Sequence, residues 1–570
     1  MNLTDEQLAA ATDPSRRVVV IAPPGSGKTA TLAARVREVR AGNLVGSQAL
    51  AVTFTNKAAR ELEERTDGKA RASTFHGLAV QLKRLCESAP FTVYDETDRA
   101  DVACTAGEDL GILKPGNYRD RRKASEKVLS DDAGRRAYTQ AMRRYRAVDY
   151  DMLVDDAIGH ARESEGLRRH FSSTHALIDE TQDNDPKQWE LLGLLQPPAV
   201  FVVGDPRQQI YGWRGGSATG LLRAWNDVAP DGSPRWGRHA LTRNFRSVPG
   251  IVSLGNRIAS GMPVEAPPMV ASRLPLDAPA VLAGVTDSAD EEADAVAGYI
   301  LKSIDGWESG PPRAMVLVRQ WRHLDRVRDA LKAAGVPHLH LGERSNFWQA
   351  EPVKIAIRAL GLAVNPANDL WTRQLAGWAG VPMVQVRRAQ VAAARTGDPL
   401  AVVLRSLSGG SVPWLPALDG TTRASDAVGL VDASLRITDR YRTTGRTTKA
   451  ELAEELRTRV LAWESEASDT SVRALLDHLA TRSAQDEATE SPVWLATVHA
   501  VKGLEAPHVA VVGMHQGGFS GSAEEDRRLW FVAATRARDS LLCMASGVPG
   551  AFWAEAMEES RGSGSDVSAS

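Results

Sequence analysis

The chain has 570 residues, of which 43% are hydrophobic and 25% are charged, and its formal net charge at pH 7 is −2. This length exceeds what one hydrophobic core usually organises, so we expect about three to five domains. The near-neutral charge excludes a protein that binds nucleic acid through overall positive charge, and any such binding would depend on local basic segments.

The cysteines and the apolar stretches indicate the cellular environment. Cys86, Cys104 and Cys543 are widely separated and too few for a four-cysteine iron–sulfur cluster. The polar start at 1–7 lacks the basic and apolar regions of a signal peptide. No apolar stretch approaches the roughly 20 residues that span a bilayer. We therefore expect a soluble, cytoplasmic protein with reduced thiols and no membrane partner.

Short apolar runs, each ending in polar or glycine residues, recur along the chain. Continuous runs of this length are typical of strands buried on both faces of a parallel sheet. The first half contains runs at 18–21, 49–52, 177–178 and 200–203. The second half contains runs at 315–318, 494–496, 509–512 and 541–542. Helical patterns separate them, so each half is predicted to form a doubly wound α/β domain.

Two segments with helical patterns interrupt this alternation. Because both lie between predicted strands of a sheet, we expect them to be inserted helical domains. The last residues are rich in glycine and serine, which is typical of a flexible tail. The predicted parts are 1–84 with 171–250, an insertion at 85–170, 251–367 with 491–558, an insertion at 368–490, and a tail at 559–570.

A glycine-rich loop follows the first predicted strand and precedes a predicted helix. Its residues are Ala22, Pro23, Pro24, Gly25, Ser26, Gly27, Lys28 and Thr29. Such glycines let backbone N–H groups converge on phosphate oxygens at the positive end of a helix dipole. The lysine is expected to reach the β- and γ-phosphates and the threonine hydroxyl to bind Mg²⁺. The strand–loop–helix context favours nucleotide binding over a merely glycine-rich turn, although Ala22 stands where the strict motif has glycine.

Two acidic residues follow the apolar run at 177–178. Asp179 is predicted to hold Mg²⁺, directly or through water, and Glu180 to polarise the attacking water. An Asp-Glu pair after an apolar run is also common in solvated turns. The phosphate loop in the same chain favours the catalytic interpretation, with ATP and Mg²⁺ as cofactors.

Further short segments occur in a fixed order along both halves. They are 3–7, 51–62, 73–77, 179–183, 204–216, 241–247, 496–505 and 524–538. Together with the phosphate loop, these segments resemble the motifs of the UvrD/Rep-type superfamily 1 DNA helicases. The resemblance implies two RecA-like parallel-sheet domains of the P-loop NTPase type, each with a mainly helical insertion. ATP would bind between these domains, and single-stranded DNA would cross both.

The resemblance also implies roles around the nucleotide. Gln7 would read the adenine edge, Phe245 would stack on adenine, and Glu505 would contact the ribose. Three further residues would act on the γ-phosphate, one as its sensor and two as its arginine contacts: Gln208, Arg246 and Arg536. An arginine from a facing domain stabilises the transition state only when the cleft closes, which would couple hydrolysis to domain movement.

A single-strand track is implied by the same resemblance. Tyr211 and Trp213 would lie against bases, with Arg214 close by and His499 near the track. The two motifs that follow the phosphate loop would add the contacts Phe54, Asn56, Thr74 and His76. Aromatic faces that stack on bases, beside an arginine that holds phosphate, grip a strand without reading its sequence.

The activity implied is ATP-dependent 3′→5′ movement on single-stranded DNA with unwinding at single-strand/double-strand junctions. The segment 368–490 is short and lacks the Gly-Ile-Gly hairpin with which relatives often touch duplex DNA. This departure favours an alternative, a regulatory or sensing ATPase that acts with an accessory protein without robust unwinding. An RNA track also stays open. The arginines of the first insertion either line a DNA groove or form a solvated helix face: Arg135, Arg136, Arg143 and Arg144.

Overall fold

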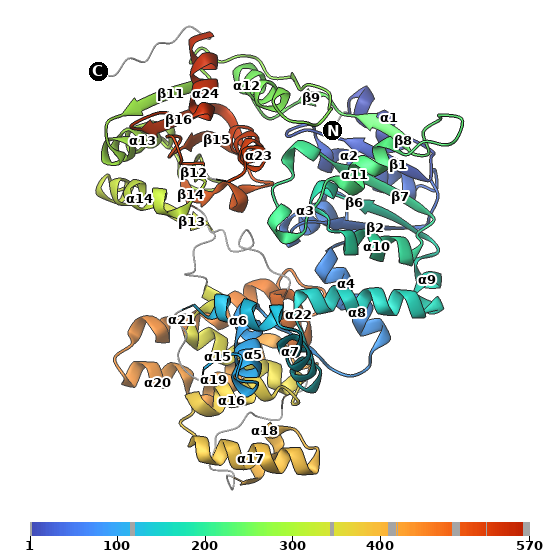
Figure 1. Ribbon diagram of the computed structural model, residues 1–570, viewed down its shortest axis with the longest axis vertical. Helices are drawn as coiled ribbons and strands as arrows, with labels where there is room; N and C mark the ends of the chain where they lie inside the picture. The colour runs from blue at the N-terminus through green and yellow to red at the C-terminus, as the bar shows by residue number, and fades with distance from the viewer. Residues whose placement is uncertain are drawn as a thin grey trace. The chain divides into compact units, whose positions relative to one another are not determined.

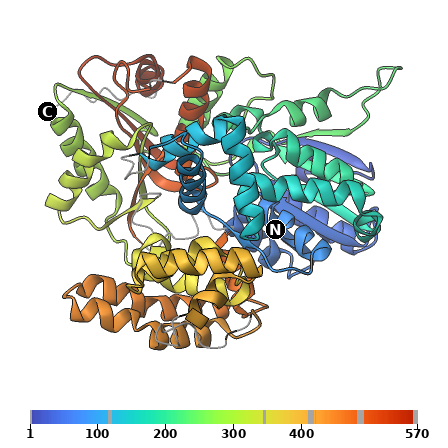
Figure 2. The same cartoon turned by 60° about the horizontal axis from the view of Figure 1, so that its bottom comes forward.

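The computed structural model describes residues 3–114, 120–341, 347–407, 418, 420–480, 491–519 and 521–562. These residues form two compact units, each assembled from separate stretches of the chain. The first unit comprises Met1–Phe75, Ala161–Glu343 and Ser483–Ser570, and the second comprises His76–His160 and Arg344–Arg482. Figure 1 labels the helices and strands of both units, and Figure 2 shows them from a second direction.

The first unit contains two parallel sheets, and the first of them carries the phosphate loop. Its strands are β1 (Arg17–Ile21), β2 (Gln48–Thr53), β3 (Ala70–Thr74), β6 (Thr174–Ile178), β7 (Ala199–Gly204) and β8 (Gly237–Ala240). They lie in the order β3-β2-β6-β7-β1-β8 (Figure 1), and all neighbours are parallel. The residues Val18 to Ile21 of β1 are buried, as expected for an internal strand covered on both faces.

Helices complete the first half of this unit. They are α1 (Asp5–Thr12), α2 (Lys28–Arg40), α3 (Asn56–Arg65), α9 (Glu165–Phe171), α10 (Pro186–Leu195) and α11 (Thr219–Asn226). Side chains such as Leu32 and Val36 of α2 pack with Val18 and Val20 of β1 in one core. This packing fixes the start of α2 directly behind the phosphate loop.

The second sheet has the order β11-β16-β15-β12-β14-β13, again with all neighbours parallel. Its strands are β11 (Val281–Thr286), β12 (Ala314–Val318), β13 (His338–Leu341), β14 (Val493–Thr497), β15 (Ala506–Val511) and β16 (Ala537–Ser546). Its helices are α12 (Pro249–Ser260), α13 (Ala289–Ser303), α14 (Leu324–Ala333), α23 (Ala523–Ala534) and α24 (Ala551–Gly562). Trp530 and Phe531 of α23 are fully buried in its core. A separate two-stranded pair, β9 (Arg243–Asn244) and β10 (Val270–Ala271), lies between the two sheets in the sequence.

The second unit is mainly helical. Its first stretch contains α4 (Phe75–Cys86), β4 (Thr92–Val93), α5 (Glu96–Asp109), α6 (Arg121–Ser130), α7 (Asp132–Arg144), β5 (Ala147–Val148) and α8 (Tyr150–Glu163). Its second stretch contains α15 (Glu351–Val364), α16 (Asp369–Trp378), α17 (Met383–Thr396), α18 (Leu400–Leu407), α19 (Ala424–Leu435), α20 (Ile437–Thr443), α21 (Thr447–Glu464) and α22 (Val472–Ala480). Tyr94 and Met142 of the first stretch share a buried core with Leu360 and Val460 of the second.

The two parallel six-stranded sheets confirm the predicted α/β fold class. Every predicted apolar run falls in a strand, except that the run 509–512 extends one residue beyond the end of β15. The strands β3, β8, β11 and β13 do not follow from the apolar-run pattern. The four-domain division stays a prediction beside the two units. Residues 559–562, expected in a flexible tail, belong to α24, because Glu559 accepts hydrogen bonds from Ser253 and Arg257. The rest of the expected tail, 563–570, lies outside the described residues.

Across the part of the chain that the structure describes, no helix is both long and apolar enough to cross a membrane.

Candidate ATPase and single-strand site

The phosphate loop connects β1 to α2 in a conformation that depends on its glycines. Gly25 and Gly27 have φ values of +70° and +81°, which glycine adopts without the strain that other residues incur. Gly27 is also the N-cap residue of α2. The Ser26 hydroxyl donates to the Pro23 carbonyl at 2.7 Å. The loop therefore presents a helix N-terminus suited to an anion.

A segment near β9 packs directly on this loop. The Asn244 side chain donates to the Pro24 carbonyl at 2.8 Å, and the Phe245 N–H donates to the Gly25 carbonyl at 2.8 Å. A Cβ atom on Gly25 would lie 2.6 Å from the Cβ of Arg246. Glycine is thus required at position 25 for a second reason, the close approach of this segment.

Gln7 also contacts the loop. Its Nε2 donates to the Ser26 carbonyl at 2.9 Å, and its Oε1 accepts from the Thr4 N–H at 3.0 Å. A Cβ atom on Gly27 would lie 2.4 Å from the Gln7 Nε2. The predicted adenine-reading side chain is therefore held against the phosphate loop by the cap of α1.

Lys28, Asp179 and Glu180 come together as predicted from the sequence. Lys28 Nζ donates to Glu180 Oε1 at 2.7 Å, and the side chains are 13% and 17% exposed. The Glu180 N–H donates to Asp179 Oδ1 at 2.8 Å. Glu180 has a φ of +48°, a conformation that costs a residue with a Cβ atom energy and is common at functional sites.

Burial and charge separate the ionisation of these groups. Burial alone would lower the pKa of Lys28, but the charges of Glu180 and Asp179 raise it. Burial and the charge of Glu180 raise the pKa of Asp179 to about 6. Burial would also raise the pKa of Glu180, but the charges of Lys28 and Lys502 lower it to about 2. Glu180 is thus the ionised partner of Lys28. Asp179, whose pKa is raised, ionises less readily than Glu180.

Arg536 lies between α23 and β16 and contacts a residue that follows the first sheet's β7. It is 1% exposed, and its Nη2 donates to the Gln208 Oε1 at 3.2 Å. Its Nε and Nη1 donate to the carbonyls of Val532 and Leu504 at 3.0 and 3.1 Å. Burial and the charge of Arg246 lower the pKa of Arg536 to about 9. The predicted γ-phosphate sensor and arginine finger are therefore in contact.

Arg246 is the second arginine predicted to act on the γ-phosphate. Its Nε donates to Glu505 Oε2 at 2.5 Å, and its Nη1 donates to the Thr535 carbonyl at 3.0 Å. The side chain is 12% exposed, whereas the neighbouring Phe245 ring is 44% exposed. Phe245 therefore keeps exposed ring surface, and its stacking on adenine stays a prediction.

The predicted track residues form an aromatic cluster with different exposures. Phe54 stacks on Tyr211, with ring centroids 4.7 Å apart and planes at 20°. Tyr211 is 7% exposed, and its hydroxyl donates to the His499 carbonyl at 2.9 Å. Trp213 is 59% exposed and lies edge-on to His499, with centroids 6.3 Å apart. The exposed aromatic surface of this cluster is thus on Phe54 and Trp213, while Tyr211 is buried and stacks on Phe54.

Three other predicted track residues lie on separate elements. Asn56 begins α3, and Thr74 is buried at the end of β3. His76 belongs to the second unit, where its ring lies edge-on to Tyr150 at 5.0 Å. The side chain of Arg214 lies outside the described residues.

Comparisons with known proteins agree with this geometry. The model of an AAA domain matches residues 6–214, and the model of a UvrD-like helicase C-terminal domain matches residues 437–546. These matches support the assignment to the UvrD/Rep-type superfamily 1 helicases. "ATP-dependent DNA helicase UvrD1" of Mycobacterium tuberculosis (strain ATCC 25618 / H37Rv) is 28% identical over 95% of this chain and 81% of its own length.

Two other members of the UvrD/Rep-type family match over similar lengths. "DNA helicase II" of Escherichia coli (strain K12) is 25% identical over 95% of this chain and 84% of its own length. "ATP-dependent DNA helicase PcrA" of Bacillus subtilis (strain 168) is 24% identical over 95% of this chain and 83% of its own length.

Lys502 was not among the site residues predicted from the sequence. Lys502 is 5% exposed and donates to the Asp183 carboxylate and, at 2.6 Å, to the Gln208 carbonyl. Its ammonium also lies 5.3 Å from the centroid of the Tyr211 ring. The sequence feature that could have indicated Lys502 is its position in the segment 496–505, which resembles a motif of the family.

Arg273 was missed as well. It donates to the carbonyls of Arg246 and Arg538 at 2.8 and 2.9 Å and pairs with Asp539 at 2.7 Å. It therefore positions the segment of Arg246 against the end of the segment that carries Arg536. Nothing in the local sequence pattern marks this arginine.

Two of the four arginines of the first insertion pair with carboxylates. Arg135 pairs with Asp132, and Arg144 pairs with Asp369 at 3.3 Å. Both arginine side chains are more than half exposed. These pairings favour a solvated, charge-balanced helix face for Arg135 and Arg144.

Proposed function

We propose that this chain is an ATP-dependent DNA helicase that moves 3′→5′ on single-stranded DNA and unwinds duplex at single-strand/double-strand junctions. The two sheets would be the RecA-like motor domains, with insertions at 85–170 and 368–490. The names of the relatives support the activity, since all three are called DNA helicases. The contact between Arg536 and Gln208 carries the proposal, because it joins the two sheets at the phosphate site.

ATP binding would change the partner of Lys28. In the structure its ammonium pairs with Glu180, and phosphate oxygens would replace that carboxylate. Glu180 would then be free to orient a water molecule and accept its proton. In the structure the charges of Lys28 and Lys502 both lower the pKa of Glu180, and Lys502 would still favour its ionised form once Lys28 binds phosphate.

The residues fit a magnesium ion that binds together with phosphate. Among the described residues, no group of three or more His, Cys, Asp or Glu side chains is arranged to hold a metal by itself. Mg²⁺ in nucleotide sites is commonly held by one or two protein oxygens together with phosphates and water. Thr29 and Asp179 would supply these oxygens, and the ion would neutralise developing phosphate charge.

Hydrolysis would be coupled to movement through the arginines. Arg246 and Arg536 would stabilise charge on the γ-phosphoryl oxygens only while the two sheets are close. Loss of the γ-phosphate would remove their ligand and let the sheets separate. Repeated closing and opening would transfer the strand from one motor domain to the other.

Strand displacement tests the proposal. A duplex with a 3′ single-strand tail should be separated in the presence of ATP and Mg²⁺, whereas a duplex with a 5′ tail should stay paired. ATP hydrolysis that is stimulated by single strands without displacement of either duplex would contradict the helicase. That result would instead support the regulatory ATPase, which the missing Gly-Ile-Gly hairpin in 368–490 favours. An RNA 3′ tail in the same assay distinguishes the two tracks.

A further inference from the structure

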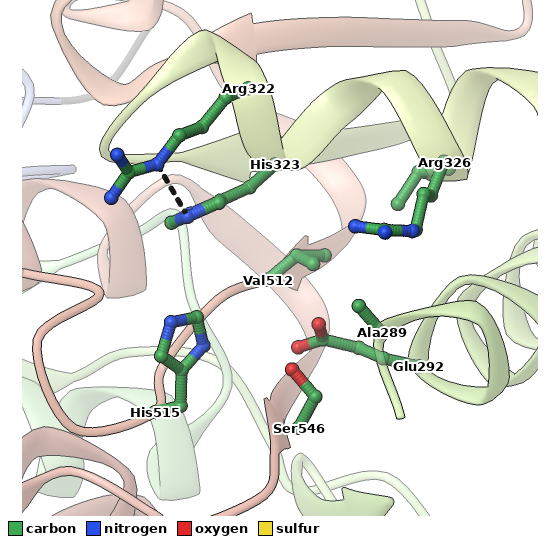
Figure 3. Close-up of a pocket in the computed structure, with 9 residues that line it drawn as sticks. Ala289, Glu292, Arg322, His323, Arg326, Val512, His515 and Ser546 are labelled. Atoms are coloured by element: carbon green, nitrogen blue, oxygen red, sulfur yellow. Dashed lines mark hydrogen bonds between the residues drawn. The ribbon is translucent and has the colours of Figure 1, made fainter. Parts of the chain in front are cut away.

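A cavity of about 500 Å³ lies in the first unit, where β15 and β16 end, and its lining carries both signs of charge. Figure 3 shows Arg322, His323 and Arg326 on one wall and Glu292 and Ser546 on the other. Because arginines and a carboxylate face the same space, the cavity favours neither an anion nor a cation. A surface with one sign of charge lies instead on α17 of the second unit.

The helices α17 and α18 form a basic hairpin. They lie beyond the shared core of the second unit (Figure 1) and have a small core of their own. Residues 383–407 contain four arginines and one acidic residue, Asp398, although the whole chain has a net charge of −2. The sequence of α17 contains no acidic residue. In the part of the chain that the structure describes, its three exposed arginines form no ion pair: Arg387, Arg388 and Arg395.

One line of side chains along α17 alternates valine with arginine. Val384, Arg388, Val391 and Arg395 are four, three and four residues apart, and side chains with this spacing are neighbours on a helix surface. Val384 and Val391 are 61% and 57% exposed. Arg387 lies between these two valines on the same side of the helix. These five residues are called the α17 stripe below.

The hairpin packs through the opposite face of α17. Val386, Ala389 and Ala393 are buried there and share a core with Leu400 and Leu404 of α18. The α17 stripe is therefore not needed for the core of the hairpin. Its apolar and cationic side chains are free to contact another molecule.

We propose that the α17 stripe is a docking surface for an amphipathic helix of a partner protein, with apolar side chains along its centre and Asp or Glu beside them. Helices that bind one another use apolar residues at this spacing, and flanking charges of opposite sign set the choice of partner. Arginine is also enriched at protein interfaces. The inference goes beyond the proposed function, since docking requires neither ATP nor DNA.

The valines favour a protein partner over duplex DNA. Arginines alone would also suit the phosphates of a duplex. A row of phosphates would leave the exposed valines without an apolar partner, whereas leucine side chains of an acidic helix would bury them. The alternation of the two residue types thus fits an amphipathic helix better than a charged backbone.

Binding of a labelled helical peptide to the full chain, measured by fluorescence anisotropy, tests this docking surface. The peptide has three heptads, each with leucine at two positions of one face and glutamate on both sides of them. It should bind the chain, and rising salt should weaken the binding because the charges are screened. A peptide with glutamine in place of every glutamate should bind at least about 10-fold more weakly.

Two double variants separate the charged and the apolar contributions. Arg388→Glu/Arg395→Glu should weaken binding by roughly 10-fold or more, because two attractive contacts become repulsive. Val384→Ser/Val391→Ser keeps the charges and should also weaken binding by roughly 10-fold, because it removes apolar area that the peptide buries. Both variants should keep the melting temperature and the ATP hydrolysis of the unaltered chain, since these side chains are exposed.

The matched control lies on α21 of the same unit. Arg457 is exposed, and Leu461 is 44% exposed. They are four residues apart, but α21 also carries glutamates such as Glu454 and Glu455. Arg457→Glu/Leu461→Ser makes the same kinds of change on a charge-balanced helix and should leave peptide affinity unchanged.

Three results would overturn the proposal. The first is a glutamate peptide that does not bind, or that binds both α17 variants like the unaltered chain. The second is binding of blunt duplex DNA that is lost in Arg388→Glu/Arg395→Glu and kept in Val384→Ser/Val391→Ser, which would make the surface a duplex contact. The third is a dimer in sedimentation that both α17 variants dissociate, which would make a second copy the occupant. Because the peptide assay contains no ATP or DNA, its result is independent of strand displacement.

Discussion

Lys502, which follows the second sheet's β14, donates from Nζ to the carboxylate of Asp183, which follows the first sheet's β6. The same ammonium donates to the Gln208 carbonyl at 2.6 Å and lies 5.3 Å from the centroid of Tyr211. One buried cation therefore contacts the acidic segment, the backbone of the proposed γ-phosphate sensor and the aromatic support of the track. We infer that Lys502 links the nucleotide site to the strand site.

Lys502→Met should uncouple these sites and destabilise the first unit. Removal of one partner of a buried ion pair leaves an uncompensated charge and costs about 3 to 5 kcal/mol. Burial raises the pKa of Asp183 to about 6 even in the presence of Lys502, so the acid has no other adequate counter-charge. Stimulation of ATP hydrolysis by single strands should fall more than hydrolysis without DNA. Steady-state ATPase assays and thermal unfolding measure the two effects.

The double variant Lys502→Met/Asp183→Asn distinguishes coupling from stability. It should recover much of the lost melting temperature, because no buried charge is left unpaired, yet stimulation by single strands should stay low. Full stimulation in the double variant would show that Lys502 only balances the charge of Asp183.

Lys28→Ala should abolish ATP hydrolysis and leave binding of single strands largely intact. Lys28 lies in the phosphate loop and pairs with Glu180 at 2.7 Å, whereas the exposed aromatic surface of the track is on Phe54 and Trp213. Phosphate-release and anisotropy assays measure the two properties. Lys69→Ala, at an exposed lysine, is the matched control and should change neither. Loss of strand binding in Lys28→Ala would mean that the track is wrongly assigned.

Asp179→Asn should raise the thermal stability of the nucleotide-free protein at pH 8 and change it little near pH 4. The folded state raises the pKa of Asp179 from 3.8 to about 6. Its favourable contribution to folding is therefore complete below pH 3.8 and is lost as the pH rises through about 6. Asparagine is neutral throughout and avoids the buried charge that forms above this window.

Melting temperatures between pH 4 and pH 8 check this expectation. Asp67→Asn, at a side chain that is 82% exposed, serves as the control and should show no comparable gain at pH 8. An Asp179→Asn protein that is no more stable than the unaltered chain at pH 8 would show that Lys28 and Lys502 already compensate the ionised carboxylate.

The sequence predicts the internal strands better than those near the sheet edges. The run Val18 to Ile21 is recognisable because an internal parallel strand is buried on both faces. In contrast, β8 is a short edge strand of Gly237–Ala240 whose residues are all partly exposed. The edge strand β13 alternates histidine with leucine, and only Leu341 is fully buried. Such strands depend on their neighbour in the sheet, which a local pattern does not contain.

The residues of the site also differ in whether a local sequence pattern predicts them. Lys28 and Thr29 follow from a continuous strand–loop–helix sequence. The contact of Arg536 with Gln208 joins residues 328 positions apart, and that of Lys502 with Asp183 joins residues 319 apart. Family resemblance brought the first pair to one site. The second pair was not predicted, although Asp183 and Lys502 both lie in segments that resemble family motifs. Tyr211 was expected against a base, and its burial depends on Phe54 and His499, which are distant in sequence.

Trp213→Ala should weaken single-strand binding by roughly 1 to 3 kcal/mol, the usual contribution of one base stacked on an aromatic ring. Trp213 is 59% exposed and contacts the His499 ring edge-on, so its removal leaves no large cavity in a core. Thermal stability should therefore change little, whereas anisotropy with oligothymidylate should report the loss of affinity. Trp307→Ala provides a tryptophan control away from the track. An unchanged affinity in Trp213→Ala, with Phe54→Ala still defective, would place the bases on Phe54 alone.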